Sequence, residues 1–454
     1  MFLSASKQKE IFMKNKESVN IAVIGTGYVG LVSGACFSEM RHRVVCVDND
    51  ENKIRMLRKL KMPIYEEGLS ELVEKNVKAK RLFFTTSIKD AMKWEGIRTE
   101  AVFIAVGTPP REDGSADLSA VEKVSMEVAL NMTDYTVIVE KSTVPVETCH
   151  WIEKTIKRYN KKNIPFDVCS NPEFLREGVA IDDFLKPDRI VLGVSSERAK
   201  NLLLRIYKPL SKYPILVCDV KSAELIKHAS NSFLSTKISF INAVANICEK
   251  TGANVELVAK GMGLDKRIGP DFLKAGIGFG GFCFPKDLDA FYWLSKQKGY
   301  DFELLKEVKK INEGQKKWMV RKIEEELWNL KDKVIAILGL SFKPKTDDMR
   351  FAPSIDIINN LLSKQALVRG YDPVALDNAK KIFGNRIEYF NDLYRCVTGA
   401  DCICIVTEWD EIRNMDLKKV YKLAKHPIII DGRNVFDPDT VRGLGFTYVS
   451  VGRP

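Results

Sequence analysis

One cysteine of this chain stands in a setting that suits a nucleophile. Cys283 follows four glycines between positions 276 and 281 and precedes Pro285 and Lys286, in the segment KAGIGFGGFCFPKDLD. Proline is favoured in the first turn of a helix, so Cys283 is expected at or just before a helix N-terminus. A helix N-terminus and a nearby lysine both favour the nucleophilic thiolate. The alternative is a buried structural thiol, which is how the other nine cysteines are interpreted.

A second motif indicates a dinucleotide. In IAVIGTGYVG, an apolar run is followed directly by Gly25, Gly27 and Gly30 in GxGxxG spacing, and a helix-like segment comes next. Such glycines allow a tight turn, close approach of a pyrophosphate and close packing of helix on strand. Asp48 ends the next strand-like run, at the distance expected for a carboxylate that binds the adenosine ribose and so favours NAD over NADP. The alternative is a glycine-rich turn without a ligand.

Further polar residues follow strand-like runs or share a helical face. Thr108 and Thr143 lie in turns just past two apolar runs, where open parallel sheets bind ligands. Lys227 and Asn231 are four residues apart, as on one face of a helix. A thiol beside a dinucleotide suggests hydride transfer to NAD through a thiohemiacetal and a thioester, which needs a base and a partner for the alkoxide. Taken alone, each threonine turn is more often a plain proline-containing turn, and Lys227 or Asn231 is more often a solvated surface group.

The spacing of apolar runs predicts the elements that must position these residues. Strand-length runs alternate with amphipathic stretches, which is typical of βαβ units. We therefore predict an α/β fold with two Rossmann-like doubly wound domains joined by a central helical segment. The second α/β domain has only Gly339 after VIAILGL, so it should not bind a dinucleotide in the same way. Strands are expected at residues 21–24, 43–47, 101–106, 136–140, 166–169, 190–194, 215–218, 334–340, 366–371, 401–406 and 427–431.

The predicted boundaries give four parts. Residues 1–19 form an N-terminal arm, 20–220 an NAD-binding domain, 221–330 a helical domain and 331–454 a second α/β domain.

Composition narrows the class of protein. The chain has 454 residues, of which 45% are hydrophobic and 29% charged, and a formal net charge of +11, so it suits an ordinary globular protein of more than one domain. We expect no signal peptide and no membrane span, since no apolar run is long enough. The scattered cysteines, without a CxxC pair, predict a reduced cytoplasmic protein. No nucleic-acid-binding motif is evident. We therefore assign the excess of basic side chains to the binding of small anionic ligands and to the solvated surface.

Taken together, the motifs resemble one family. GTGYVG, VGTP, STVPV, NPEFLREG, AELIKHASNSFL, FLKAGIGFGGFCFPKD, GLSFKPKTDDMR and DGRNVFD occur in family order and resemble the nucleotide-sugar dehydrogenases of the UDP-glucose/GDP-mannose dehydrogenase family, in particular the UDP-glucose 6-dehydrogenases. The resemblance covers the chain from Ile21 to the C-terminus. It implies a four-electron, NAD-dependent oxidation of UDP-glucose to UDP-glucuronate. It also implies a homodimer or higher homo-oligomer through the central helix, with no metal, nucleic acid or membrane partner.

The resemblance assigns roles residue by residue. Cys283 would be the covalent nucleophile, with Lys227, Asn231 and Asp287 around the reacting carbon and Thr143 positioning water. Glu173 and Glu177 both fit the base of thioester hydrolysis; we favour Glu173, with Glu177 nearer the nicotinamide. The implied NAD residues are Gly25, Gly27, Gly30, Asp48, Lys53, Thr108, Thr143, Glu177, Lys286 and Arg350. The implied substrate residues are Glu173, Phe174, Leu175, Arg176, Glu177, Lys227, Arg267, Phe272, Leu273, Lys274, Ala275, Gly276, Gly280, Lys343 and Arg433.

Several points stay open at this level. The chain departs from the family pattern at Phe282, beside the nucleophile, where serine is common. Arg267 resembles an arginine that the family often supplies across a dimer interface. The substrate could be another nucleotide sugar, such as GDP-mannose or a UDP-N-acetylhexosamine. A non-catalytic nucleotide-sugar-binding protein is a more remote alternative, against which the intact Cys283, Lys227 and Asp287 argue.

Overall fold

The computed structural model describes residues 17–454, so most of the predicted N-terminal arm lies outside the described residues. The chain divides into two compact units, Met1–Ala229 and Ser230–Pro454, and helix α10 (Val220–Thr251) contains the boundary. The first unit is built on an eight-stranded sheet in the order β10-β9-β8-β7-β6-β1-β2-β3. Its strands are β1 (Asn20–Ile24), β2 (Arg43–Val47), β3 (Leu82–Thr85), β6 (Ala101–Ile104), β7 (Thr136–Glu140), β8 (Phe166–Ser170), β9 (Ile190–Gly193) and β10 (Ile215–Cys218).

The second unit repeats the same topology. Its six-stranded parallel sheet has the order β13-β12-β11-β14-β15-β16. Its strands are β11 (Val334–Leu338), β12 (Leu367–Tyr371), β13 (Glu388–Phe390), β14 (Cys402–Ile405), β15 (Ile428–Asp431) and β16 (Thr447–Ser450). Counted within each unit, both sheets contain the doubly wound strand order 3-2-1-4-5-6, which the first unit extends by β9 and β10. The two Rossmann-like domains predicted from the sequence are therefore present.

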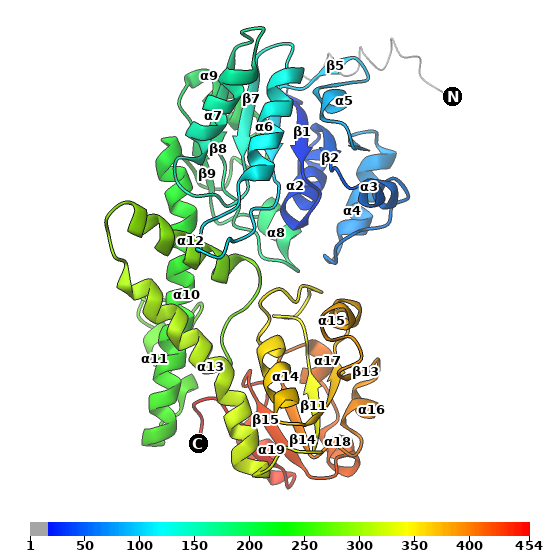
Figure 1. Cartoon of the computed structure of the whole chain (residues 1–454), viewed down its shortest axis with the longest axis vertical. Coiled ribbons are helices and arrows are strands. Elements are labelled where there is room, and N and C mark those ends of the chain that lie inside the picture. The colour runs from blue at the N-terminus through cyan, green and yellow to red at the C-terminus, as the bar shows by residue number, and fades with distance from the viewer. Residues whose placement is uncertain (1–16) are drawn as a thin grey trace. The chain divides into compact units, whose positions relative to one another are not determined.

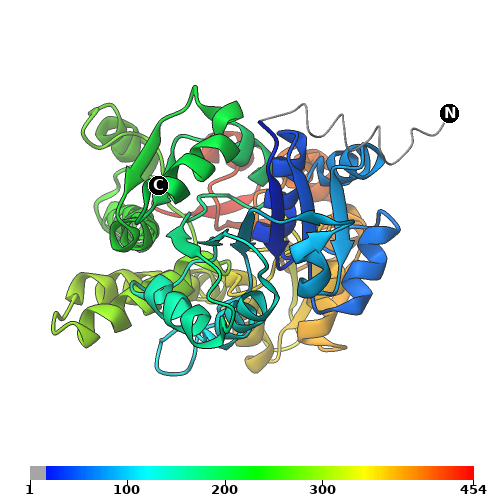
Figure 2. The same cartoon turned by 90° about the horizontal axis from the view of Figure 1, so that it is seen from above.

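Helices cover both faces of each sheet (Figures 1 and 2). In the first unit they are α2 (Tyr28–Glu39), α3 (Glu51–Arg58), α4 (Leu69–Lys78), α5 (Ile88–Met92), α6 (Ser119–Asn131), α7 (Thr148–Tyr159), α8 (Ala180–Leu185) and α9 (Glu197–Ile206), with the 3-10 turn η1 (Lys208–Leu210) and a small hairpin of β4 (Lys93–Trp94) and β5 (Ile97–Arg98). In the second unit α10 is followed by α11 (Val255–Gly263), α12 (Cys283–Gln297), α13 (Glu303–Leu327), α14 (Pro353–Ser363), α15 (Leu376–Phe383), α16 (Leu393–Val397), α17 (Asp410–Arg413), α18 (Leu417–Leu423) and α19 (Pro438–Gly443). No helix in residues 17–454 is long and apolar enough to cross a membrane.

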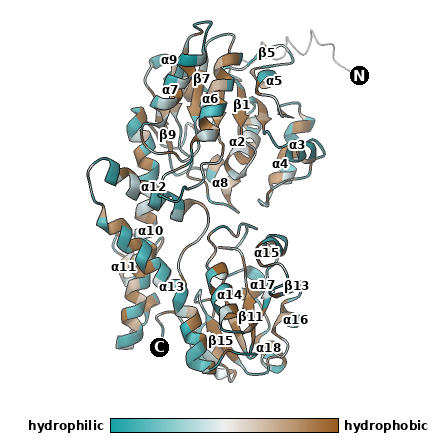
Figure 3. Cartoon of the chain, viewed as in Figure 1, coloured by the Kyte–Doolittle hydropathy of each residue, from teal (hydrophilic) through white to brown (hydrophobic). Residues whose placement is uncertain are grey.

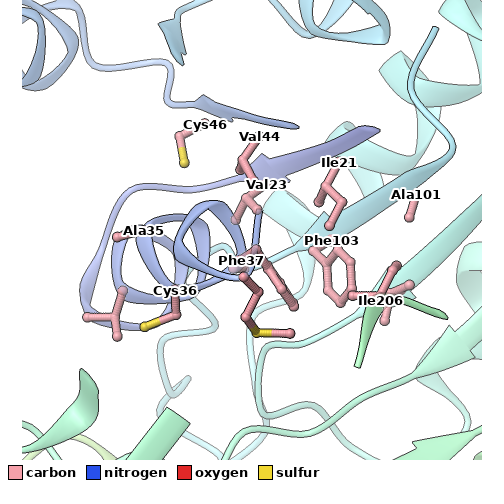
Figure 4. Close-up of a cluster of buried hydrophobic side chains, with 14 of the residues drawn as sticks. Ile21, Val23, Ala35, Cys36, Phe37, Val44, Cys46, Ala101, Phe103 and Ile206 are labelled. Carbon is pink, nitrogen blue, oxygen red and sulfur yellow. The ribbon is translucent and has the colours of Figure 1, made fainter. Parts of the chain in front are cut away.

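Each sheet is buried because its strands are apolar on both faces (Figure 3). In the first unit, alternate residues of β1 and β6 point to opposite layers: Ile21 and Phe103 pack against α2, whereas Ala22 and Ile104 belong to the layer of α5, α6 and α7. Figure 4 shows the first of these layers, where the rings of Phe37 and Phe103 lie 4.7 Å apart between their centroids. This packing fixes the strand ends from which the site residues project.

The sequence located most strands within one or two residues and missed a few. Strands β2, β7 and β10 have the predicted bounds. The prediction omitted β3, β13 and β16, which are at most four residues long and lie at sheet edges, where apolar patterning is weakest. One pairing in the first sheet departs from the parallel arrangement of βαβ units, since β8 pairs antiparallel with β9. The four domain boundaries stay a prediction.

Candidate active site

The glycine turn after β1 has the conformation that a dinucleotide-binding loop requires. Gly25 has φ +106°, and a Cβ built on it would lie 2.3 Å from the Ala105 carbonyl oxygen. A Cβ on Gly30 would lie 2.0 Å from the Gly25 oxygen, so both glycines are needed by the chain's own backbone. Gly27 differs, because a Cβ there would meet nothing within 4 Å. It is the N-cap of α2 and supplies no side-chain cap, so this helix N-terminus is open to an anion.

Asp48, at the end of β2, holds this loop. Its carboxylate accepts hydrogen bonds from Thr26 N at 2.9 Å, Thr26 Oγ1 at 2.7 Å and Asp50 N at 3.0 Å, and Lys53 Nζ lies 3.7 Å away. Burial acts to raise the pKa of Asp48, but these hydrogen bonds and the Lys53 charge lower it below its usual value. The residues fit the adenosine end of NAD. Sequence reasoning missed Thr26, although it lies between the first two motif glycines.

The two threonine turns predicted to line a ligand lie together at neighbouring strand ends. Thr108 Oγ1 donates to the Thr143 carbonyl oxygen at 3.0 Å. Two buried groups hold the loop around Thr143: His228 Nε2 is 2.8 Å from the Val144 oxygen, and Glu224 accepts from Cys149 N at 2.9 Å at the start of α7. The position of Thr143 is therefore tied to the helix that carries Lys227.

Glu173 and Lys227 form a buried ion pair. Lys227 Nζ lies 2.9 Å from Glu173 Oε1, and the side chains are only 5% and 3% exposed. Glu173 Oε2 accepts from Leu175 N at 2.6 Å, which fixes the carboxylate orientation. Two cations lie near the Phe174 ring, with Arg189 Cζ at 3.6 Å and Lys227 Nζ at 5.4 Å from its centroid. Arg189, in the sequence KPDRI just before β9, was not among the predicted site residues.

The two glutamates of NPEFLREG differ in setting. Glu173 is buried, whereas Glu177 is half-buried. Arg176, between them, is exposed and pairs with Asp183 at 2.7 Å. Burial beside a cation suits a base that must act on water in a site closed to bulk solvent. Of the two glutamates, Glu173 is thus the one that is buried and paired with a cation.

In the second unit, Cys283 is the first residue of α12, as the sequence predicted, and Pro285 lies in the first turn. One turn on, Asp287 is fully buried and accepts from Asn231 Nδ2 at 2.6 Å. Lys286 Nζ lies 2.7 Å from Asp287 Oδ1. The structure thus brings three predicted catalytic residues and a buried lysine to one helix end.

The glycines before Cys283 pack against the chain itself. A Cβ on Gly276 would lie 2.9 Å from the Gly432 oxygen, and one on Gly280 would lie 2.3 Å from the Phe351 oxygen. Arg433, which is 15% exposed, donates from Nη1 to the Gly278 oxygen at 3.0 Å and from Nε to the Val406 oxygen at 2.8 Å. The glycine segment therefore packs against the ends of β14 and β15, and Arg433 holds it there through hydrogen bonds.

The other predicted substrate residues have mixed settings. The side chains of Leu273 and Ala275 lie in the hydrophobic core. Lys274 is exposed, Phe272 is half-buried with φ +62°, and Lys343 has its Nζ 5.5 Å from the Phe342 ring centroid. Arg350 pairs with Asp348 at 2.6 Å, and its Cζ lies 4.3 Å from the Phe282 ring centroid. Arg267, 89% exposed, pairs with Asp265.

The predicted residues thus form two groups, one within each unit. The first unit contains the glycine loop, Asp48, the threonine turns, Phe174, Glu173 and Lys227. The second contains Asn231, Cys283, Asp287 and the cationic residues Arg267, Lys286, Lys343, Arg350 and Arg433. Within residues 17–454, no cluster of three or more His, Cys, Asp or Glu side chains could hold a metal ion. A doubly wound sheet with this glycine loop and a carboxylate at the end of β2 defines the class of NAD-binding dehydrogenases.

Comparison with known proteins identifies the family. Residues 19–211, 221–314 and 336–438 match the NAD binding, central and UDP binding domains of the UDP-glucose/GDP-mannose dehydrogenase family. The chain belongs to this family, and its cofactor is NAD. It is 47% identical over 434 residues to the UDP-glucose 6-dehydrogenase TuaD of Bacillus subtilis, covering 96% of this chain and 93% of that protein.

Solved structures agree with this assignment. A UDP-glucose dehydrogenase from the archaeon Pyrobaculum islandicum has a TM-score of 0.89 at 36% identity, covering 96% of this chain and 98% of that one. A UDP-D-ManNAc dehydrogenase from Pyrococcus horikoshii has a TM-score of 0.83 at 27% identity, covering 95% and 99%. The fold is therefore shared by family members that are named for different sugars.

Proposed function

We propose that this chain oxidises UDP-glucose to UDP-glucuronate with two molecules of NAD, through a covalent intermediate on Cys283. The observation that carries the proposal is Cys283 at the N-terminus of α12, with buried Lys286 and Asp287 in the same turn of the helix and Asn231 of α10 bonded to Asp287. The similarity to UDP-glucose 6-dehydrogenases over 96% of the chain supports the substrate. NAD, when bound, accepts one hydride from the sugar C6 in each of two oxidations.

The chain's residues take the following roles in this proposal. Lys227 stabilises the negative charge on the C6 oxygen, and Asp287 accepts the hydroxyl proton through a water molecule. The Cys283 thiolate then adds to the aldehyde carbon to give a thiohemiacetal. Loss of a second hydride turns the thiohemiacetal into a thioester. The ion pairs that hold Lys227 and Asp287 keep both side chains oriented before the substrate arrives.

Hydrolysis releases the acid. A water molecule, positioned by Thr143, gives its proton to Glu173 as its oxygen bonds to the thioester carbon. The carbon–sulfur bond breaks, and Cys283 leaves as the thiolate. The pairing of Glu173 with Lys227 and with Leu175 N supports this role, because it leaves the carboxylate with a fixed direction. Glu177 is the alternative base.

The test is the ratio of NADH formed to UDP-glucose consumed. We expect a ratio of two in the native protein, whereas simple alcohol oxidation would give one. Cys283→Ser should lower release of UDP-glucuronate by about a thousandfold or more. Cys218→Ser, at the half-buried cysteine that ends β10, is the matched control and should retain the native rate. Two-NADH turnover unchanged in Cys283→Ser would overturn the nucleophile assignment.

A related substrate is the second candidate, because the fold is shared with a UDP-D-ManNAc dehydrogenase. NADH formation with UDP-glucose, UDP-N-acetylmannosamine and GDP-mannose, each at the same concentration, separates these candidates. Good turnover of one of the others with none of UDP-glucose would contradict our substrate proposal.

We also propose that the chain forms a homo-oligomer and works in a reducing compartment, the cytoplasm. Phe233, Phe240 and Ile247 recur every seven residues along α10 and are 65%, 52% and 60% exposed. Such an apolar stripe supports burial against a second copy. All ten cysteines are free thiols, which supports the reducing compartment.

A further inference from the structure

One buried residue of α13 holds the backbone of the glycine segment, residues 276–281, which leads to Cys283. Asn312 is 3% exposed, and its side-chain amide makes two hydrogen bonds to Phe279. Phe279 N donates to Asn312 Oδ1 at 2.8 Å, and Asn312 Nδ2 donates to the Phe279 oxygen at 3.0 Å. The amide uses its donor and its acceptor on the same residue, which fixes the direction of the backbone at that point.

The glycine at position 278 is required by this contact. Gly278 has φ +94°, and a Cβ built on it would lie 2.7 Å from Asn312 Oδ1. An alanine there would both strain the backbone and displace the amide. The close approach of Asn312 therefore accounts for one of the four glycines that precede the nucleophile.

The neighbouring residues of the segment are held from other elements of the second unit. Gly276 N donates to Asn242 Oδ1 of α10 at 2.8 Å, and Ile277 N donates to the Gly432 oxygen after β15 at 3.0 Å. The Gly278 oxygen accepts from Arg433 Nη1 at 3.0 Å. Four consecutive residues are thus hydrogen-bonded, and Asn312 makes the contact nearest in sequence to Cys283.

Phe279 carries this restraint to the helix that begins at Cys283. Its ring packs edge-on against the ring of Phe284, the second residue of α12, with 5.7 Å between the centroids. It also belongs to the same buried cluster as Leu288 of α12 and Leu305 of α13, the next helix along the chain (Figure 1). A shift of the Phe279 backbone would therefore be transmitted to the first turns of α12.

We propose that Asn312 is a positioning residue for the nucleophile, because its amide fixes Phe279 and so the place of Cys283 at the start of α12. This assignment rests on the proposed function. In the step concerned, the Cys283 thiolate sulfur bonds to the aldehyde carbon, and an electron pair of the C=O bond moves to its oxygen to give the thiohemiacetal. The first hydride transfer precedes this bond and the second requires it, so misplacement of the sulfur slows the second alone.

The structure offers a matched pair of variants on α13. Asn312→Ala removes both hydrogen bonds to Phe279. Gln315→Ala removes an amide that is 1% exposed on the same helix, accepts from Asn246 Nδ2 of α10 at 3.2 Å, and lies outside the contacts with Phe279. Each variant loses a buried amide, so the pair separates the placement of Cys283 from the packing of α13.

The readout is the time course of the two hydride transfers. Each protein, in excess over UDP-glucose and with saturating NAD, is mixed in a stopped-flow cell, and NADH absorbance is followed. For Asn312→Ala we expect the first NADH at the native rate and the second about tenfold slower or more. The KM for NAD should not change, and Gln315→Ala should keep the native time course. A merely destabilised protein would lose amplitude equally from both NADH phases.

Three outcomes would overturn this role of Asn312. They are equal slowing of both NADH phases in Asn312→Ala, a native time course in that variant, and the same split between the phases in Gln315→Ala. If Asn312→Ala does not fold, Asn312→Asp is judged by the same criteria, since it keeps an acceptor for Phe279 N and replaces the donor to the Phe279 oxygen. Failure of the proposed function looks different, because the native protein would then form no NADH from UDP-glucose, or only one per sugar.

Discussion

At the residue scale, the carboxyl group with the clearest cost to stability is Glu140, the last residue of β7. It is 1% exposed, and Oε1 accepts from Ser142 N at 2.7 Å. Burial, the largest cause, raises its pKa to about 8, and the charge of Glu224 adds to the increase, while the Ser142 hydrogen bonds oppose it. Glu140 thus retains a proton in the folded chain at a pH where the unfolded chain has lost it.

This difference predicts how stability depends on pH. Between the usual carboxyl pKa and about pH 8, raising the pH favours the unfolded state, because only the folded chain still binds the proton. Glu140→Gln should remove this dependence. The decrease in unfolding free energy from pH 5 to pH 8 should therefore be about 2–4 kcal/mol smaller in the variant than in the native chain. Urea unfolding at both pH values measures it. Glu122→Gln, at an exposed residue of α6, is the control and should behave as the native chain does.

Lys141 and Glu140 also show where residue-level prediction stops. The sequence shows a charged pair, EK, at the end of an apolar strand, which marks a strand end and no more. Only packing makes Glu140 a protonated group and gives Lys141 an amide partner and two charged neighbours. By contrast, Cys283 was predicted from sequence because glycine, proline and lysine around it each have a local physical meaning.

At the scale of the element, two glycines of the turn after β1 should affect different properties, one the stability of the fold and the other the binding of NAD. Gly30→Ala should lower the unfolding free energy by about 1–3 kcal/mol, because the new Cβ would lie 2.0 Å from the Gly25 oxygen. Gly27→Ala should leave stability nearly unchanged, since nothing lies within 4 Å of the new Cβ, yet weaken NAD binding about tenfold or more by blocking the open N-terminus of α2.

Thermal unfolding without ligand and calorimetric titration with NADH measure the two effects separately. Gly96→Ala, on the small hairpin, is the control. A Cβ there also meets no atom within 4 Å, but φ is +81°, so this variant should lower stability through backbone strain and leave NADH binding unchanged. Unimpaired NADH binding by Gly27→Ala would contradict the assignment of this turn to the cofactor.

At the scale of the whole molecule, the α10 stripe of Phe233, Phe240 and Ile247 leads to a prediction about the oligomeric state. Phe240→Glu puts a charge at its centre and should convert the oligomer into monomers at micromolar concentration, because a desolvated charge without a partner opposes association. Sedimentation velocity measures this. Leu130→Glu, at a residue of α6 that is 51% exposed outside the stripe, should leave the oligomer intact. A native protein that sediments as a monomer would contradict the proposed oligomer.

The sequence by itself determined the fold class, the glycine loop with Asp48, and the helix that begins at Cys283. Each depends on local rules of strand periodicity, backbone freedom at glycine, and helix capping, so neighbouring residues suffice. Only the tertiary structure decided that Glu173 rather than Glu177 is buried against Lys227, that Leu273 and Ala275 belong to the core, and that Lys141 is buried with an amide partner. These properties arise from contacts between residues tens of positions apart, since desolvation and pairing depend on distance in space, which spacing along the chain does not record.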